Sequence, residues 1–133
     1  MLELLREQLA KMPEVRVAAA FGSVARGEER SGSDLDLALL LDTDATPRRW
    51  EIEAALGRTA GREVDFVYMN EAPPLLRFEI ARDGVLLLER HPGDWSDFRA
   101  RAMIDWWDWA PTAKMITDTI LRRQKERLER GQA

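Results

Sequence analysis

The amino-acid sequence predicts an α/β fold, in which short apolar strands alternate with helices. Three apolar runs have the length of buried strands, at residues 15–21, 34–41 and 63–69, and a shorter run, VLLL, covers residues 85–88. Apolar residues at helical spacing lie before, between and after these runs. Such alternation is typical of a sheet with helices packed on it. The 133 residues are enough to bury a core in one domain without disulfides or a structural metal ion.

The first helix is predicted over residues 2–12, where apolar side chains recur at helical spacing until Pro13 ends the run. The strand at residues 15–21 follows and stops abruptly at Gly22, as a buried strand entering a tight turn should. Gly22 and Gly27 are residues whose backbone can adopt unusual dihedral angles or approach a ligand closely. We therefore expect a turn of special geometry directly after the first strand.

The residues around this turn could bind a phosphate and a cation. Ser23 stands where a hydroxyl and the following backbone N–H groups could hold phosphate at a helix N-terminus. Asp34 and Asp36 are two residues apart, so both carboxylates should point to one face of a strand over residues 34–41. Two carboxylates beside a phosphate-binding turn can hold a divalent cation that carries a triphosphate. Taken alone, a Gly-Ser turn is usually only a turn, and Asp-x-Asp is usually a solvated strand end.

A third carboxylate follows the next predicted helix. That helix is expected over residues 47–60, with Thr46 as its N-cap and Pro47 at its first position. In the strand at residues 63–69, Asp65 is flanked by apolar residues, and burying a carboxylate in a central strand is costly unless it is paired or bound to a metal. Asp65 is therefore either a third site carboxylate, a strand-end residue or half of a buried ion pair with an arginine.

A further helix is predicted after residue 70, ending near Asp83 with Gly84 as its C-cap. His91 is the only histidine, and the chain contains no cysteine. No second histidine or cysteine could complete a metal site with it, so we expect His91 to be a turn residue.

The tail, residues 94–133, is predicted to be helical and is composed differently from the rest. Asp94 or Ser96 could cap its first helix, and Pro111 should break or restart it. Residues 122–130 alternate Lys or Arg with Glu, which is more typical of a solvated helix end than of a nucleic-acid patch.

Four of the five tryptophans lie between Trp95 and Trp109, and such clustering usually reflects core packing. Trp106 and Trp107 are adjacent, however, so on a helix of ~3.6 residues per turn they point about 100° apart. One helix face rarely buries both. Part of the cluster is therefore a candidate interface anchor.

Composition limits the other function classes. The formal net charge is -4, which argues against a large nonspecific nucleic-acid surface, so direct nucleic-acid binding is not expected. No apolar run is long enough to span a membrane, and the N-terminus lacks the apolar core of a signal peptide. The sequence predicts a cytoplasmic protein.

Taken together and in order, the stretch GSVARGEERSGSDLDLALL resembles the signature of the DNA polymerase beta-like nucleotidyltransferase superfamily: Gly-Ser, ten residues, then Asp-x-Asp. The Ala25-Arg26-Gly27 and Ser33-Asp34 elements resemble the minimal nucleotidyltransferase branch, small proteins usually paired with a HEPN-domain partner. The resemblance implies a mixed sheet flanked by helices. We expect residues 1–133 to form a single nucleotidyltransferase domain, with a catalytic α/β core at 1–91 and a helical C-terminal extension at 92–133.

The resemblance also implies site residues and cofactors. The superfamily places its third carboxylate on the strand after the intervening helix, where Asp65 stands. Asp34 and Asp36 would hold one Mg²⁺ ion that bridges the triphosphate of ATP, and a second ion would be shared with Asp65, which is also the candidate general base. The expected nucleotide-binding residues are Gly22, Ser23, Arg26 and Ser33.

The chain has no large second domain to bind a polymer, a transfer RNA or an antibiotic, so its acceptor should come from a partner. The resemblance implies an antitoxin in a hetero-oligomer with a HEPN toxin, often an RNase, to which it transfers AMP on a tyrosine. One alternative is a small-molecule nucleotidyltransferase of the aminoglycoside type. Another is an antitoxin that acts by binding alone, although three carboxylates around a phosphate turn argue against it.

Overall fold

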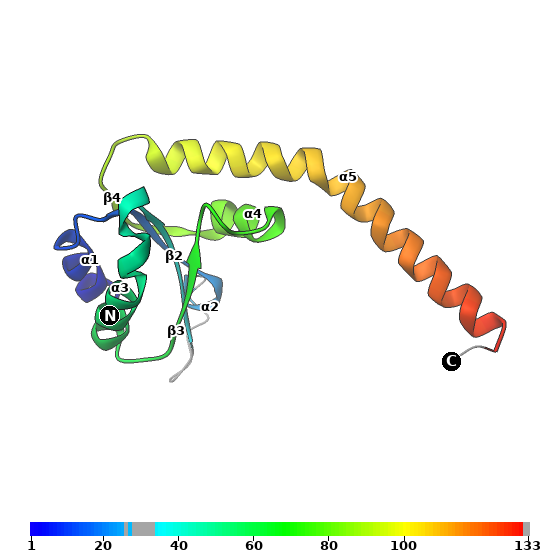
Figure 1. Ribbon diagram of the computed structural model, residues 1–133, viewed down its shortest axis with the longest axis horizontal. Coiled ribbons are helices and arrows are strands. Elements are labelled where there is room, and N and C mark those ends of the chain that lie inside the picture. Colours follow the sequence, from blue (N-terminus) through cyan, green and yellow to red (C-terminus); the bar gives the residue numbers. More distant parts are fainter. Residues whose placement is uncertain (26, 28–33, 132–133) are drawn as a thin grey trace.

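The computed structural model describes residues 1–25, 27 and 34–131 and confirms the predicted α/β fold. Figure 1 shows a layered body from which the C-terminal half of the last helix projects. In chain order the elements are α1 (Leu2–Ala10), β1 (Val15–Phe21), α2 (Gly22–Ala25), β2 (Leu35–Leu41), the 3₁₀ helix η1 (Thr43–Arg48), α3 (Arg49–Ala60), β3 (Val64–Tyr68), α4 (Pro74–Asp83), β4 (Val85–Glu89) and α5 (Asp94–Glu129).

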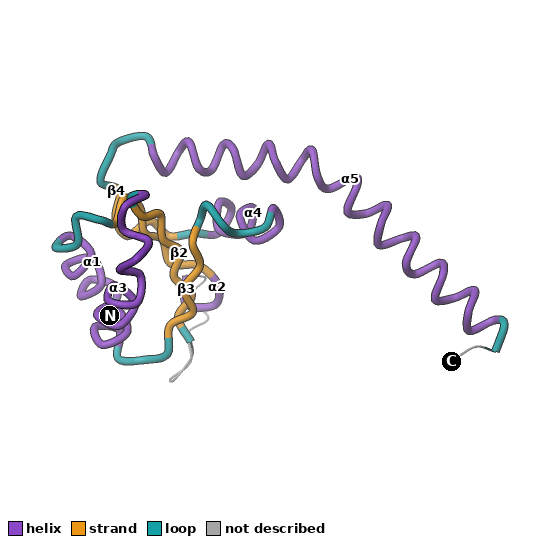
Figure 2. Tube along the Cα trace, viewed as in Figure 1, coloured by secondary structure: helices purple, strands orange, loops and turns teal. Residues whose placement is uncertain are grey.

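The four strands form one mixed sheet in the order β3-β2-β1-β4. β1 runs antiparallel to both β2 and β4, while β2 and β3 are parallel. Helices α1 and α3 pack on one face of the sheet, and α4 and the first half of α5 pack on the other (Figures 1 and 2). The mixed sheet implied by the family resemblance is therefore confirmed, with β1 and β2 at its centre.

Alternation of side chains along each strand divides the core into two layers. Leu35, Leu37 and Leu39 of β2 are fully buried under α1 and α3, together with Leu5 and Leu9 of α1. The predicted N-terminal packing helix is thus confirmed. The other layer gathers apolar side chains of the sheet, α4 and α5, namely Val17, Ala19, Phe21, Ala38, Met69, Ile80, Ala81, Trp95, Phe98 and Ala102.

Two predicted element starts are wrong. β2 begins at Leu35, so Asp34 lies one residue outside the strand. The helix predicted over residues 47–60 with Thr46 as its N-cap begins instead at Arg49, because the 3₁₀ helix η1 occupies the connection. A 3₁₀ helix bonds each N–H to the carbonyl three residues back and is narrower than an α-helix, which suits a short connection directly after a strand.

The premise that Asp65 lies in a central strand is also wrong. β3 is an edge strand of the sheet, and Asp65 is exposed. Strand order depends on pairing between distant segments, which the apolar content of one strand does not reveal. Asp65 therefore carries no burial cost, and the interpretation as a buried ion pair is excluded.

Gly84 occupies the C-cap position of α4, as predicted. Its backbone, however, is not in the left-handed conformation that usually favours glycine at a C-cap. Its φ of −64° and ψ of 138° are accessible to any residue. A Cβ atom at this position would lie 2.4 Å from the carbonyl oxygen of Ile80 and 3.0 Å from the indole of Trp95. A carbonyl of α4 itself is therefore the main reason for glycine here, and the Trp95 ring of α5 fills the remaining space.

α5 spans residues 94–129 as a single helix. Its N-cap position is Gly93, with a φ of 98°, and not Asp94 or Ser96 as predicted. The Asp94 carboxylate instead accepts a hydrogen bond from the Arg16 guanidinium at 2.8 Å. This ion pair ties the start of α5 to the start of β1.

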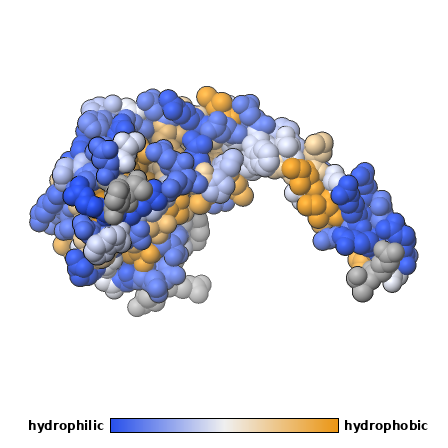
Figure 3. Space-filling model, in the orientation of Figure 1, coloured by the Kyte–Doolittle hydropathy of each residue, from blue (hydrophilic) through white to orange (hydrophobic). Residues whose placement is uncertain are grey.

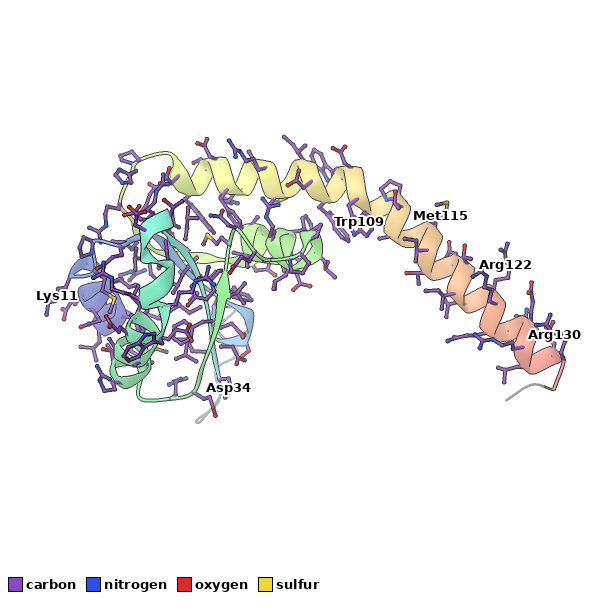
Figure 4. The ribbon with its side chains drawn as sticks, viewed as in Figure 1. Lys11, Asp34, Trp109, Met115, Arg122 and Arg130 are labelled. Atoms are coloured by element: carbon purple, nitrogen blue, oxygen red, sulfur yellow. The ribbon has the colours of Figure 1, made fainter. Side chains whose placement is uncertain are left out.

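The prediction that Pro111 breaks or restarts the tail helix is wrong, because α5 continues through it. Proline lacks an N–H, and its ring clashes with the carbonyl four residues earlier, so it bends a helix that packing holds together. Figure 4 shows the change of direction between Trp109 and Met115. Beyond the bend α5 leaves the body, and residues 120–131 are all exposed. No described helix, α5 included, has an apolar stretch long enough to cross a membrane.

The tryptophans of α5 differ in burial, as the different directions of the adjacent Trp106 and Trp107 predicted. Trp95 is buried and stacks on Phe98, with ring centroids 5.7 Å apart. Trp106 is half-buried and stacks on Phe78 of α4 at 5.4 Å, whereas Trp107 is 69% exposed. Trp106 therefore packs on the body, and Trp107 faces away from it.

Alanine substitutions should separate these two tryptophans. We expect Trp106→Ala to lower the free energy of unfolding by about 1–3 kcal/mol, less than the ~3–5 kcal/mol of a fully buried tryptophan, because it removes the stack between α4 and α5. Trp107→Ala should change it by no more than about 0.5 kcal/mol. Thermal and denaturant melts of both full-length variants measure the difference. Equal losses would contradict the packing described for α5.

Candidate active site

The candidate site lies where β1 ends and β2 begins. Antiparallel pairing sets Phe21, the last residue of β1, opposite Asp36 of β2. Parallel pairing sets Asp65 of β3 beside Asp36 on the other side. Neighbouring strands lie about 4.8 Å apart, so the sheet brings two of the predicted carboxylates side by side.

Both carboxylates belong to the face of the sheet that α4 and α5 cover. Asp36 shares its face of β2 with Ala38, and Asp65 shares its face of β3 with Val67. Ala38 and Val67 both pack in the layer under α4 and α5. Asp34 is exposed just before β2 and lies at the end of the sheet in Figure 4.

The turn after β1 passes unusually close to Asp36. Gly22 has a φ of +76° and Gly27 a φ of +75°, which confirms the prediction that their backbones adopt unusual dihedral angles. A Cβ atom at Gly22 would lie only 2.1 Å from Oδ2 of Asp36. Glycine suits this position both because of its backbone conformation and because any Cβ atom would displace the carboxylate.

The remaining predicted nucleotide-binding residues are placed only in part. Ser23 is the second residue of α2, directly after Gly22, and is half-buried. Arg26 and Ser33 lie outside the described residues. The roles of Gly22, Ser23, Arg26 and Ser33 in binding nucleotide stay predictions.

A pocket of about 240 Å³ opens beside Asp36. One wall is formed by the end of β1 and by β2, and the other by the last turns of α4. The lining residues are Phe21, Gly22, Asp36, Glu79, Arg82 and Asp83. Sequence reasoning missed the three α4 residues. Their spacing could have indicated that they lie together, since residues three and four apart share one face of a helix.

Arg82 is the positively charged member of this wall. Its Nε donates to Oδ1 of Asp83 at 3.0 Å, and its Nη2 donates to Oδ2 at 2.8 Å. The hydrogen bond to Asp83 raises the pKa of Arg82 above its ordinary value. The same guanidinium lies 5.3 Å from the centre of the Phe78 ring, the ring on which Trp106 stacks.

The donor set suits Mg²⁺, which prefers carboxylate oxygens. Among the described residues, no three His, Cys, Asp or Glu side chains are gathered closely enough to form a ready metal cage. Mg²⁺ sites usually have one or two carboxylates, with phosphates and water completing the octahedron. The paired positions of Asp36 and Asp65 fit that kind of site. His91 lies in an exposed turn between β4 and α5, as predicted.

Comparison with known sequences gives a family match and named relatives. Residues 3–93 match the family described as polymerase beta, nucleotidyltransferase. A protein adenylyltransferase MntA of Shewanella oneidensis is 30% identical over 84 residues, which are 62% of this chain and 58% of that protein. A second, from Aphanizomenon flos-aquae, is 28% identical over 113 residues, 77% of this chain and 75% of that protein. The match thus spans less than two thirds of the Shewanella relative.

Comparison with solved structures shows the same fold. A toxin–antitoxin crystal structure with AMP-PNP has a TM-score of 0.70 and 24% identity and covers 90% of this chain and 94% of that chain. A structure of a tri-AMPylated Shewanella oneidensis HEPN toxin in complex with its MNT antitoxin has a TM-score of 0.67 and 22% identity, covering 91% and 99%. At sequence identities of 24% and 22%, these matches show that the chains share a fold.

The contact between Gly22 and Asp36 can be tested by a pair of substitutions. Gly22→Ala and Gly61→Ala both place a side chain at positive φ, which costs about 1–2 kcal/mol, but no atom lies within 4 Å of the Cβ position at Gly61. We therefore expect similar losses of thermal stability, with Gly22→Ala alone also displacing Asp36 and losing MgATP binding. Calorimetric titration measures the binding. Unchanged MgATP affinity in a folded Gly22→Ala protein would show that this close approach does not shape the site.

Proposed function

Since this chain belongs to the polymerase beta nucleotidyltransferase family, whose model matches residues 3–93, we propose that it is an antitoxin that transfers AMP from ATP to a tyrosine of a HEPN toxin. The observation that carries the proposal is the Gly22 turn held against Asp36, with Asp65 beside it on the next strand. Two relatives named protein adenylyltransferase MntA and a relative fold solved with an AMPylated HEPN toxin support it.

In this proposal the acceptor hydroxyl attacks the α-phosphorus of ATP, the bond to the β-phosphate breaks, and pyrophosphate leaves. Mg²⁺, when bound by Asp34, Asp36 and Asp65, supplies charge neutralisation for the triphosphate. Ser23 and the backbone N–H groups after Gly22 hold phosphate oxygens. Asp65 takes the proton of the attacking hydroxyl, and its exposure on the edge strand lets an acceptor reach it.

The acceptor would dock through the projecting half of α5, residues 109–128, here called the arm. Trp109, Ala113, Ile116 and Ile120 recur every three or four residues along it. This spacing continues the stripe formed by Trp95, Phe98, Ala102 and Trp106, which packs on the body. On the arm the stripe has no partner in the described chain, and Ile116 and Ile120 are 45% and 49% exposed.

Figures 3 and 4 show that this stripe faces the concave side of the arm. Hydrophobic atoms gather there in Figure 3, and Trp109 points to the same side in Figure 4, whereas Met115 points outward. The concave side belongs to the sheet face that carries Asp36 and Asp65. A partner seated on the arm would therefore lie on the side of the sheet that carries these carboxylates.

The partner proposed for the arm is a helical protein whose apolar groove is bordered by carboxylates. Anchors at i, i+4, i+7 and i+11 are the pattern with which a helix enters a groove between other helices. Residues 109–131 carry six Lys or Arg and three Asp or Glu, in a chain of net charge −4. A second copy fits less well: outside α5, the exposed large apolar residues among the described ones are Leu4, Trp50 and Leu75, on three different helices.

Carboxylate substitutions should abolish transfer without unfolding the protein. Asp36→Asn keeps the shape of the side chain but binds Mg²⁺ far more weakly, so no AMP should be transferred. Asp65→Ala should lose turnover while MgATP binding largely survives. The measurement is the intact mass of the proposed HEPN toxin partner after incubation with ATP and Mg²⁺, with thermal melts as the folding control. Full transfer by Asp36→Asn would remove this residue from the mechanism.

A wild-type protein that binds the toxin without adding mass would favour an antitoxin that acts by binding alone.

Two adjacent arm residues provide a matched test of docking. Ile116→Glu places a charge on the concave stripe, and Met115→Glu places the same charge on the outer side, where Met115 is 63% exposed. Only Ile116→Glu should weaken the complex, by about 2 kcal/mol or more if Ile116 is an interface anchor. Neither should change the melting temperature appreciably. The affinity for the toxin is measured by calorimetry, and equal affinities of the two variants would place the docking surface elsewhere.

A further inference from the structure

The wall that α4 contributes to the pocket beside Asp36 carries charged residues that lie outside the Gly-Ser and Asp-x-Asp motif. Three of the lining residues, Asp36, Glu79 and Asp83, carry carboxylates. Of the described residues that line the pocket, Arg82 alone carries a positive charge. A nucleoside triphosphate brings several negative charges into this space, so a cation on the pocket wall would have a large electrostatic effect.

The strand order assigns a direction to the reaction. Asp65 lies on the edge strand β3, Asp36 on β2 and Gly22 at the end of β1, so the pocket beside Gly22 is on the opposite side of Asp36 from Asp65. In phosphoryl-type displacements the attacking and leaving oxygens are roughly in line. An acceptor that arrives at Asp65 would expel pyrophosphate toward β1 and α4, which is where Arg82 stands.

Arg82 is placed so that it can exchange its present partner for phosphate. Its side chain is 54% exposed, and its partner Asp83 is the next residue in the chain. An exposed ion pair of this kind contributes little to stability, so leaving it costs little. A guanidinium binds two phosphate oxygens in the same forked geometry with which it now binds the two oxygens of Asp83. The guanidinium also lies 5.3 Å from the centre of the Phe78 ring, which adds a cation–π contact to its present position.

We propose that Arg82 is a catalytic residue that binds the β- and γ-phosphates of the nucleoside triphosphate and neutralises the pyrophosphate as it leaves. This inference rests on the proposed function, because it requires that the pocket binds a triphosphate. It adds a binding group on the wall opposite the Gly22 turn. A purely structural role would be different: a basic residue in the last turn of a helix also stabilises the helix dipole.

Titration with two nucleotides separates these roles. The full-length protein and the variants Arg82→Ala, Arg82→Lys and Arg58→Ala are titrated with MgATP and with AMP, and each is melted thermally. Arg58 is the matched control, since it is the basic residue in the last turn of α3, on the other face of the sheet. We expect Arg82→Ala to bind MgATP roughly tenfold or more weakly but AMP within about twofold of wild type, because AMP lacks the phosphates that Arg82 contacts. Arg82→Lys should recover part of the loss, and Arg58→Ala should bind as wild type does.

The outcomes distinguish this inference from the proposed function. If wild type binds MgATP and Arg82→Ala binds it equally well, Arg82 does not contact phosphate and only the inference is overturned. An equal loss for MgATP and AMP would also overturn it, because the defect would then not lie at the β- and γ-phosphates. If the wild-type protein does not bind MgATP at all, the proposed function fails and the inference fails with it.

Discussion

The close approach of the Gly22 backbone to the Asp36 carboxylate is the constraint on which the candidate site depends. It arises because β1 pairs with β2 so that Phe21 faces Asp36. The chain must then turn within one residue, at positive φ, with only 2.1 Å between the position of a Cβ atom and Oδ2. A Cβ atom at position 22 would displace the Asp36 carboxylate from the turn. A phosphate held by this turn is thereby kept beside the group that would hold its cation.

The same sheet decides what surrounds this contact. Because side chains alternate along a strand, the buried leucines of β2 point toward α1 and α3 while Asp36 points toward α4 and α5. Parallel pairing with β3 adds Asp65 on that face, where it is exposed on an edge strand of the sheet. The face therefore has a wall on the β1 side, formed by α4, and an opening on the β3 side. In the proposed reaction the acceptor would enter on the β3 side, and pyrophosphate would leave on the β1 side.

α5 serves two structural roles in one helix. Its first turns complete the core through Trp95, Phe98 and Ala102, so packing of the α/β core runs past residue 92. The division into a core at residues 1–91 and an extension at 92–133 stays a prediction. After Trp106 the same apolar stripe continues with no partner among the described residues, and the bend at Pro111 sets the direction in which it projects (Figure 4). A helix anchored firmly at one end can present the other as a rigid docking surface.

The sequence by itself determined the local features. The strand at residues 15–21, the special backbone at Gly22 and the opposite directions of Trp106 and Trp107 follow from the character of a few neighbouring residues. Tertiary structure decided that Asp65 lies on an exposed edge and that Arg82 lines the pocket beside Asp36. These depend on which strands pair and which faces meet, interactions between residues tens of positions apart. Local periodicity carries no information about them, because it records only which side of an element is apolar and not what that side will contact.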